Sequence, residues 1–169
     1  MLKACEGQDF VDRRDTAIVR TFIDTGARLA EMAGLRLEDV DLDDQTLTVM
    51  GKGSRVRVLP IGAKAVKAID RYLRVRRGHR EHGLPALWLG RSGGMGTSGI
   101  PQMFRRRATE AGLDHLNPHQ FRHTFAHQWL RSEGPRATSW RSPGGARGRC
   151  SYAMARARGP SGRGRRTSG

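Results

Sequence analysis

The sequence has little of what several protein classes require. Its only two cysteines, Cys5 and Cys150, lie near opposite ends of the chain and do not have the close spacing of a metal ribbon. This arrangement argues against a disulfide framework and fits a reducing compartment, so we expect a cytoplasmic protein. No run of residues approaches the roughly 20 apolar residues that a membrane-spanning helix needs, and no signal-peptide pattern opens the chain. We therefore expect no membrane contact.

Acidic residues are scarce, and their scarcity is local. The chain carries 31 lysines and arginines against 16 aspartates and glutamates, a formal net charge of +15. Residues 135–169 hold nine arginines and no acid, which leaves 22 basic and 16 acidic residues elsewhere, a net charge of +6. A basic body indicates a polyanionic partner, and nucleic acid is the commonest one. Residues 135–169 also lack Leu, Ile, Val and Phe, so we expect this Arg/Gly-rich tail to be disordered.

Hydrophobic periodicity in the remainder predicts one mostly helical α+β domain with a small antiparallel β-hairpin or sheet. Apolar spacing predicts helices over 12–24, 63–77 and 100–111, and a short helix that Thr25 caps and Gly34 ends. The β-branched residues of 46–60 bracket a glycine-containing turn, which predicts a hairpin. The glycine-rich stretch 90–99 lacks the Gly-Lys-Ser/Thr ending of a P-loop and is interpreted as a connector.

A last helix is predicted from "NPHQFRHTFAHQWL", residues 117–130, where Asn and Pro supply the N-cap and first position. His119 and Arg122 are three residues apart and therefore share one face of this helix. Phe121, Phe125 and Trp129 form the neighbouring apolar stripe. The two polar side chains would face a cleft near the helix N-terminus, where an anion is favoured. An amphipathic helix with ordinary surface histidines explains this segment equally well when it is taken alone.

Three segments taken together favour the functional interpretation of this helix over the ordinary amphipathic one. "DTGARLAEMAGLRLEDVDL" (24–42), "GKGSRVRVLPIG" (51–62) and "PHQFRHTFAHQWL" (118–130) resemble the tyrosine recombinase, or phage integrase, family in order and separation. The resemblance runs from about residue 12 to residue 134. It implies that residues 1–134 form a catalytic domain of the tyrosine recombinase type, a DNA integration and recombination enzyme of the kind found on mobile elements. It implies duplex DNA as the partner, a homo-tetramer on that DNA, and no cofactor.

The resemblance assigns roles to individual residues. Arg28 and Arg122 correspond to two arginines that clamp the scissile phosphate, a task that suits the always-charged guanidinium fork. Lys52, in the hairpin turn, corresponds to the lysine that protonates the departing 5′ oxygen. His119 would hydrogen-bond the phosphate or assist proton transfer. His123 would support the site.

Two further polar features are assigned differently. Glu31 stands three residues after Arg28, and it either orients the polar groups of the site or is an ordinary helix-surface carboxylate. The cluster "HREH" (79–82) is interpreted as a solvated helix end rather than a zinc site, because no partner cysteines accompany it. Arginines replace the cation in this chemistry, so we expect no metal.

The sequence departs from the family pattern at the nucleophilic tyrosine. The family attacks the phosphate with a tyrosine, forming a 3′-phosphotyrosyl intermediate, and a His or Trp normally lies nine residues before that tyrosine. Tyr152 is the remaining candidate nucleophile, but it lies twelve residues after Trp140, and Tyr72 falls in a core-facing helix. Residues 137–155 can be back-translated with degenerate codons and read again from the third base of each codon. The permitted translations then include a Trp and a Tyr that lie nine residues apart. We hypothesise that a frameshift near 134–137 replaced the C-terminus of an integrase.

We therefore expect an integrase catalytic domain whose strand cleavage and rejoining are impaired. Only about eleven residues precede the domain, where family members carry a DNA-clamping helical domain, so we also expect truncation at the N-terminus. Three alternatives stay open: a type IB topoisomerase, which uses a similar set of residues; a non-catalytic DNA-binding or regulatory fragment; and an unstable pseudogene product. Whether the chain is an enzyme is undecided at this stage.

Overall fold

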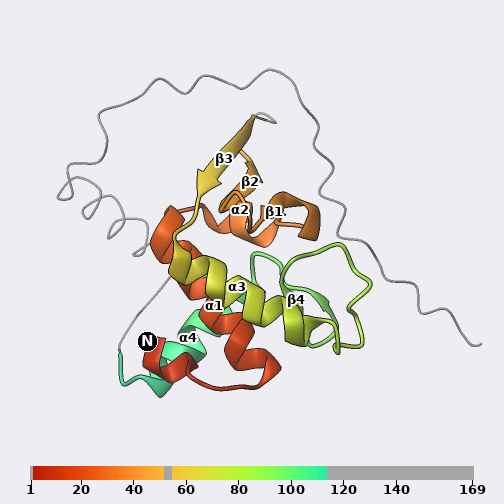
Figure 1. The fold of residues 1–169 in the computed structure, drawn as a ribbon. Helices are drawn as coiled ribbons and strands as arrows, with labels where there is room; N and C mark the ends of the chain where they lie inside the picture. The colour runs from red at the N-terminus through yellow and green to blue at the C-terminus, as the bar shows by residue number, and fades with distance from the viewer. Residues whose placement is uncertain (1, 52–54, 114–169) are drawn as a thin grey trace, which may run out of the picture.

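The structure is a computed structural model that describes residues 2–51 and 55–113 (Figure 1). In chain order, with η for a 3-10 helix, the elements are η1 (Leu2–Cys5), α1 (Phe10–Thr25), α2 (Leu29–Ala33), η2 (Leu37–Asp39), β1 (Val40–Asp41), β2 (Thr46–Met50), β3 (Val56–Pro60), α3 (Ala63–Arg76), β4 (Leu89–Gly90), β5 (Gly93–Gly94) and α4 (Gly99–Glu110). The expected α+β fold, mostly helical with a small antiparallel sheet, is confirmed. The last helix predicted from the sequence lies outside the described residues.

Helices α1 and α3 form the centre of the domain and lie side by side (Figure 1). They run antiparallel: the Gly62 amide before α3 donates to Asp24 near the end of α1 at 3.0 Å, and the ring of Phe10 at the start of α1 contacts Tyr72 of α3. Their facing sides contribute Ile18, Phe22 and Ile69, which are fully buried. Both apolar stripes were predicted from helical spacing, and burying such a stripe is what stabilises a helix in a protein.

The sheet has the strand order β1-β2-β3 with antiparallel pairing throughout. Leu47 and Val49 of β2 are buried against the core, whereas Met50 is exposed and pairs with the exposed Val56 of β3. The predicted hairpin over 46–60 is therefore confirmed, and the short strand β1 extends it. At the turn end of the hairpin, the Gly51 amide donates to the Arg55 carbonyl at 2.8 Å.

The connection between α1 and α2 differs from the sequence expectation. Thr25 does not cap α2: it is the last residue of α1, and its hydroxyl donates to the Thr21 carbonyl at 2.7 Å. Gly26 then turns the chain in the left-handed conformation, with φ 55°, a geometry that glycine adopts without steric cost. Arg28 therefore takes the N-cap position of α2. Gly34 ends α2 as predicted, but in the right-handed region at φ −82°.

A buried ion network joins η1, α1 and α4. Asp15 of α1 is fully buried and accepts from three arginines: Arg14 at 2.7 Å, Arg106 at 2.7 Å and Arg107 at 2.8 Å. Arg107 also donates to Asp12 at 2.6 Å, to Glu110 at 2.9 Å and to the carbonyl of Ala4 at 2.8 Å. Burial alone would lower the pKa of Arg107, but the hydrogen bonds that Arg107 donates to these carboxylates outweigh burial and raise it. The guanidinium therefore stays charged at every working pH.

A second buried arginine organises the connection after α3. Arg76 is 4% exposed and donates to four backbone carbonyls, those of His82, Leu84, Ala86 and Leu87, at 2.6–3.2 Å. The chain then enters β4 through Trp88, whose indole Nε1 donates to the carbonyl of Met32 in α2 at 3.0 Å. This contact ties the end of α2 to the core. No helix among the described residues is long and apolar enough to cross a membrane.

Candidate functional site

The candidate site is built around Arg28, which begins α2 directly after the turn at Gly26. The helix is positioned by its buried Met32 and by the Trp88 hydrogen bond to the carbonyl of that residue. The Arg28 side chain is 53% exposed, so much of its guanidinium faces outward. Arg28 is therefore fixed at the start of a helix that packs on the core, while its charged end stays open to a ligand.

The Glu31 carboxylate orients the Arg28 guanidinium. Its carboxylate is 3% exposed and accepts from the Arg28 amide at 2.8 Å and from Arg28 Nη1 at 2.9 Å. The same carboxylate accepts from Arg57 Nη2 of β3 at 2.8 and 2.9 Å. One buried carboxylate thus orients two guanidiniums, one from α2 and one from the sheet, and supports the first of the two interpretations of Glu31. A guanidinium has five N–H donors, so both arginines retain donors for an anion.

The electrostatics of Glu31 follow from these contacts. Burial alone would raise the pKa of the Glu31 carboxyl, but the hydrogen bonds from Arg28 and the charge of Arg57 outweigh burial and lower the pKa below its ordinary value of 4.5. The carboxylate is therefore ionised wherever the protein works. The charges of Glu31 and one arginine cancel, and the pair of arginines leaves a net positive charge at the surface.

This lowered pKa gives a testable pH dependence. A carboxyl group whose pKa is lower in the folded state contributes stability that is complete above its unfolded pKa and is lost as the pH falls through its folded pKa. The Glu31→Gln variant should therefore be less stable than the wild type at pH 7, and the difference should shrink as the pH falls below about 4.5. Urea unfolding from pH 7 to pH 3 measures it. A stability difference that stays constant over this range would contradict the assignment.

The turn end of the hairpin lies beside the Glu31 carboxylate. A Cβ added at Gly51 would stand 3.9 Å from Glu31 Oε1 and 3.9 Å from Arg57 Nε. Gly51 immediately precedes Lys52, the predicted hairpin-turn lysine, which lies outside the described residues. The last described residue before that lysine is therefore adjacent to the cluster of Arg28, Glu31 and Arg57.

His119, Arg122, His123 and Tyr152 lie outside the described residues. Of the predicted site residues, the structure thus describes Arg28 and Glu31, and it brings them into direct contact. Tyr72 is fully buried, its hydroxyl donates to the Leu87 carbonyl at 3.0 Å, and burial raises its pKa. The expectation that Tyr72 is a core residue is confirmed.

Arg57 is a member of the site that the sequence analysis missed. The Arg/Val alternation of β3 is compatible with either face pointing inward, and in the structure Val56 and Val58 are exposed while Arg57 reaches Glu31. The signal was the register: Arg57 pairs with Val49, whose side chain is buried, so Arg57 lies on the inward face near the hairpin end. Pairing the strands across the glycine-containing turn would have found it.

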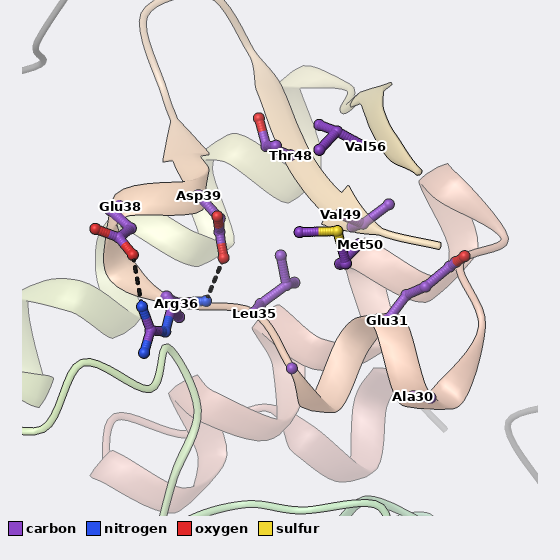
Figure 2. A pocket seen from close by; sticks show the side chains of 11 residues that line it. Ala30, Glu31, Leu35, Arg36, Glu38, Asp39, Thr48, Val49, Met50 and Val56 are labelled. Atoms are coloured by element: carbon purple, nitrogen blue, oxygen red, sulfur yellow. Dashed lines mark hydrogen bonds and ion pairs between the residues drawn. The ribbon is translucent and has the colours of Figure 1, made fainter. Parts of the chain in front are cut away.

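A small pocket lies beside α2 and borders the site, because Glu31 is one of its lining residues (Figure 2). Its volume is about 360 Å³, and η2 and β2 supply much of its wall. Arg36 is already paired there, with Nη1 2.9 Å from Glu38 and its amide 2.8 Å from Asp39. The three carboxylates of the lining, Glu31, Glu38 and Asp39, make this pocket unfavourable for phosphate. An anion is favoured instead on the open side of Arg28 and Arg57.

The "HREH" cluster engages in local contacts. The His79 ring stacks on Phe10 with 4.5 Å between centroids, and its Nδ1 accepts from the amide of Glu81 at 3.1 Å. His82 Nδ1 lies 3.0 Å from the carbonyl of His79. Within residues 2–51 and 55–113, no group of three or more potential ligand side chains is arranged to hold a metal.

Comparisons with known proteins agree on the family. The sequence model of the Phage integrase family matches residues 1–138. The tyrosine recombinase XerC of Pseudomonas aeruginosa is 39% identical over 139 residues, which cover 79% of this chain and 44% of the relative. The crystal structure of XerA recombinase superimposes with a TM-score of 0.69 at 31% identity, covering 79% of this chain and 49% of that one.

More distant structures share the fold. The Tn1549 transposon integrase in complex with transposon right end DNA gives a TM-score of 0.63 at 22% identity, covering 78% of this chain and 50% of that one. This chain spans half or less of the length of each of these relatives. The match to the family over residues 1–138, together with an exposed arginine held by a buried glutamate at the start of α2, establishes that the chain belongs to the phage integrase family.

Proposed function

We propose that this chain is the catalytic domain of a site-specific recombinase that binds duplex DNA and cleaves and rejoins its strands. The observation that carries the proposal is the Arg28 guanidinium, oriented by the buried Glu31 and still half exposed. Arginines held in this way bind phosphate oxygens through charge-assisted hydrogen bonds without reorganising. The relatives named above, a tyrosine recombinase and a transposon integrase with its DNA, support this assignment.

In the proposed reaction, a tyrosine hydroxyl attacks the scissile phosphorus and loses its proton. A bond forms between the tyrosine oxygen and phosphorus, and the bond from phosphorus to the 5′ oxygen breaks. Arg28 and Arg122 stabilise the charge that develops on the non-bridging oxygens, and His119 assists, with His123 in support. Lys52 gives its proton to the departing 5′ oxygen. Lys52 directly follows Gly51 in sequence, and Gly51 lies close to Glu31, which supports this role.

The proposal extends to the rest of the molecule in outline. Residues 1–134 are proposed to be the catalytic domain and residues 135–169 a disordered tail. The chain is proposed to work in the cytoplasm and to assemble as a homo-tetramer on its DNA. Tyr152 is the only tyrosine left as a nucleophile, because Tyr72 is buried and hydrogen-bonded. Cleavage is therefore proposed to be impaired relative to relatives with a regular nucleophile.

A second candidate follows from that observation about tyrosine. Among the described residues no tyrosine is accessible to a phosphate, so a non-catalytic DNA-binding fragment that retains the Arg28 site is the alternative. It would bind duplex DNA and compete with active recombinases for sites. The experiment below separates the two candidates.

The test uses a library of nicked suicide duplexes, which trap covalent protein–DNA adducts. The full chain should form a low level of adduct, and Arg28→Ala should reduce it by roughly 100- to 1,000-fold, the loss expected when one preorganised donor is removed. Tyr152→Phe should abolish it. Arg36→Ala, an exposed arginine outside the site, is the matched control and should leave it unchanged. Salt-sensitive DNA binding without any adduct would favour the non-catalytic fragment.

A further inference from the structure

A groove lined by positive charge lies along α1 and α3, and none of Arg28, Glu31 and Arg57 is among its lining residues. Its volume is about 540 Å³, and residues of the N-terminal segment close one end. Five basic side chains line it: Arg13, Arg20, Lys64, Lys67 and Arg71. Glu6 is the only acidic residue of the lining. We call this feature the basic groove.

The cations of the basic groove have no carboxylate partners. None of the five forms an ion pair or hydrogen bond with a side chain in the part of the chain that the structure describes. Other arginines of the same helices do: Arg14 binds Asp15, and Arg74 binds Asp70. The thiol of Cys5 in the lining does not add negative charge, because burial raises its pKa to about 11. The groove therefore carries an uncompensated positive charge.

The spacing of these cations is regular. Arg13, Thr16 and Arg20 follow each other at intervals of three and four residues on α1, and Lys64, Lys67 and Arg71 do so on α3. Each set therefore lies on one helix face and extends over about 10 Å, at 1.5 Å per residue. Because α1 and α3 are antiparallel neighbours, the two sets form facing rows along one groove. Such rows fit a linear polyanion that lies between them.

We infer that the basic groove binds the phosphate backbone of DNA, as a second contact that is separate from the Arg28 site. This inference rests on the proposed function, which supplies the duplex. Arg20 lies about five residues, or roughly 7.5 Å along the helix, before the end of α1, from which the chain turns to Arg28. The groove extends from there in the opposite direction along α1. It contacts phosphates away from the scissile one and adds affinity without sequence readout.

An acidic protein segment is the competing occupant, and magnitudes favour DNA. The most acidic exposed stretch of the described residues runs from η2 into the turn after it, over residues 38–44. There Glu38 and Asp39 already bind Arg36, and Asp41 accepts from two amides of its own turn. Exposed ion pairs of this kind contribute about 0–1 kcal/mol each. Each phosphate contact instead releases a condensed counterion, which changes the logarithm of affinity by about 0.9 per logarithm of salt concentration.

The test measures the affinity of the full chain for a 30-base-pair duplex of mixed sequence at several salt concentrations. The triple variant Lys64→Gln, Lys67→Gln, Arg71→Gln should lower the slope of log affinity against log salt by about 2–3, the value for three phosphate contacts. The matched control, Arg36→Gln, Arg80→Gln, Arg91→Gln, removes the same charge from exposed positions outside the groove and should change the slope by less than about 1. The nine arginines of residues 135–169 are present in every variant, so the difference isolates the groove. Thermal unfolding confirms that each variant is folded.

Each outcome decides one question. An unchanged slope in the groove variant, or an equal change in both triple variants, would overturn the inference while leaving the proposed function intact. Poly-glutamate that binds the wild type more tightly than the groove variant, while the duplex binds both equally, would assign the groove to an acidic protein and also overturn it. A wild type that shows no salt-dependent duplex binding would overturn both the inference and the proposed function. Arg28→Ala should reduce adduct formation and retain most of the salt slope.

Discussion

Asp15→Asn is expected to lower the free energy of unfolding by about 3–5 kcal/mol, the cost of removing one partner from a buried ion pair. Asp15 is fully buried and receives hydrogen bonds from Arg14, Arg106 and Arg107. The amide of asparagine brings no negative charge to these guanidiniums and directs one N–H₂ group at them. Arg14 and Arg107 are themselves buried, so water cannot replace the lost acceptor.

Urea unfolding at pH 7 measures this loss, and the exposed Asp43→Asn is the matched control, expected to change stability by no more than about 0.5 kcal/mol. The loss should persist at high salt, because a buried network is screened little. A loss below about 1 kcal/mol would show that the arginines find other acceptors. The network also fixes η1 through the Arg107 bond to the Ala4 carbonyl, so the variant should expose the N-terminal segment to proteolysis first.

The elements that could be predicted from the sequence are those that local patterns determine. The apolar stripes of α1 and α3 and the glycine-containing hairpin required only periodicity and turn chemistry. Arg28 could be found because its surrounding motif is contiguous in sequence, and its companion Glu31 lies one helical turn further along the chain. These features need no information about which distant segments meet.

The features that were missed depend on tertiary contacts. The "RRD" of residues 13–15 looks like a solvated helix start, yet Asp15 is the most buried charged residue of the part that the structure describes. It is buried because α4 brings Arg106 and Arg107 to it from more than 90 residues away. Arg57 reaches Glu31 only because of the register of the hairpin. Thr25 was predicted as a cap because threonine favours that position, but the turn at Gly26 moved the helix start to Arg28. In each case tertiary packing, rather than the local sequence preference, determined the position of the residue.

The second large effect is expected for Arg76→Met, which should lower the free energy of unfolding by about 3–4 kcal/mol. Hydrogen bonds to a charged group contribute about 1.5–3 kcal/mol each, and methionine keeps the packing of the aliphatic stem while removing the donor from four carbonyls. Three of the four bonds are only partly buried, so water replaces the donor there and the expected loss is that of one to two bonds. The matched control is Arg74→Met on the same helix. Its side chain is 70% exposed and pairs only with Asp70, so the expected change is within about 0.5 kcal/mol.

The position of the Arg28 site depends on this same arginine. The segment that Arg76 holds also forms backbone bonds to the chain after α2, from Leu37 to the Pro85 carbonyl at 2.9 Å and from Leu87 to the Leu35 carbonyl at 2.8 Å. In Arg76→Met, the amides of Leu37 and Leu87 should therefore exchange hydrogen faster than in the wild type, and the Arg74→Met control should not show this change. Unchanged exchange at both amides would mean that Arg76 stabilises the core alone. Faster exchange would show that a residue remote from Arg28 determines where α2, and with it Arg28, is placed.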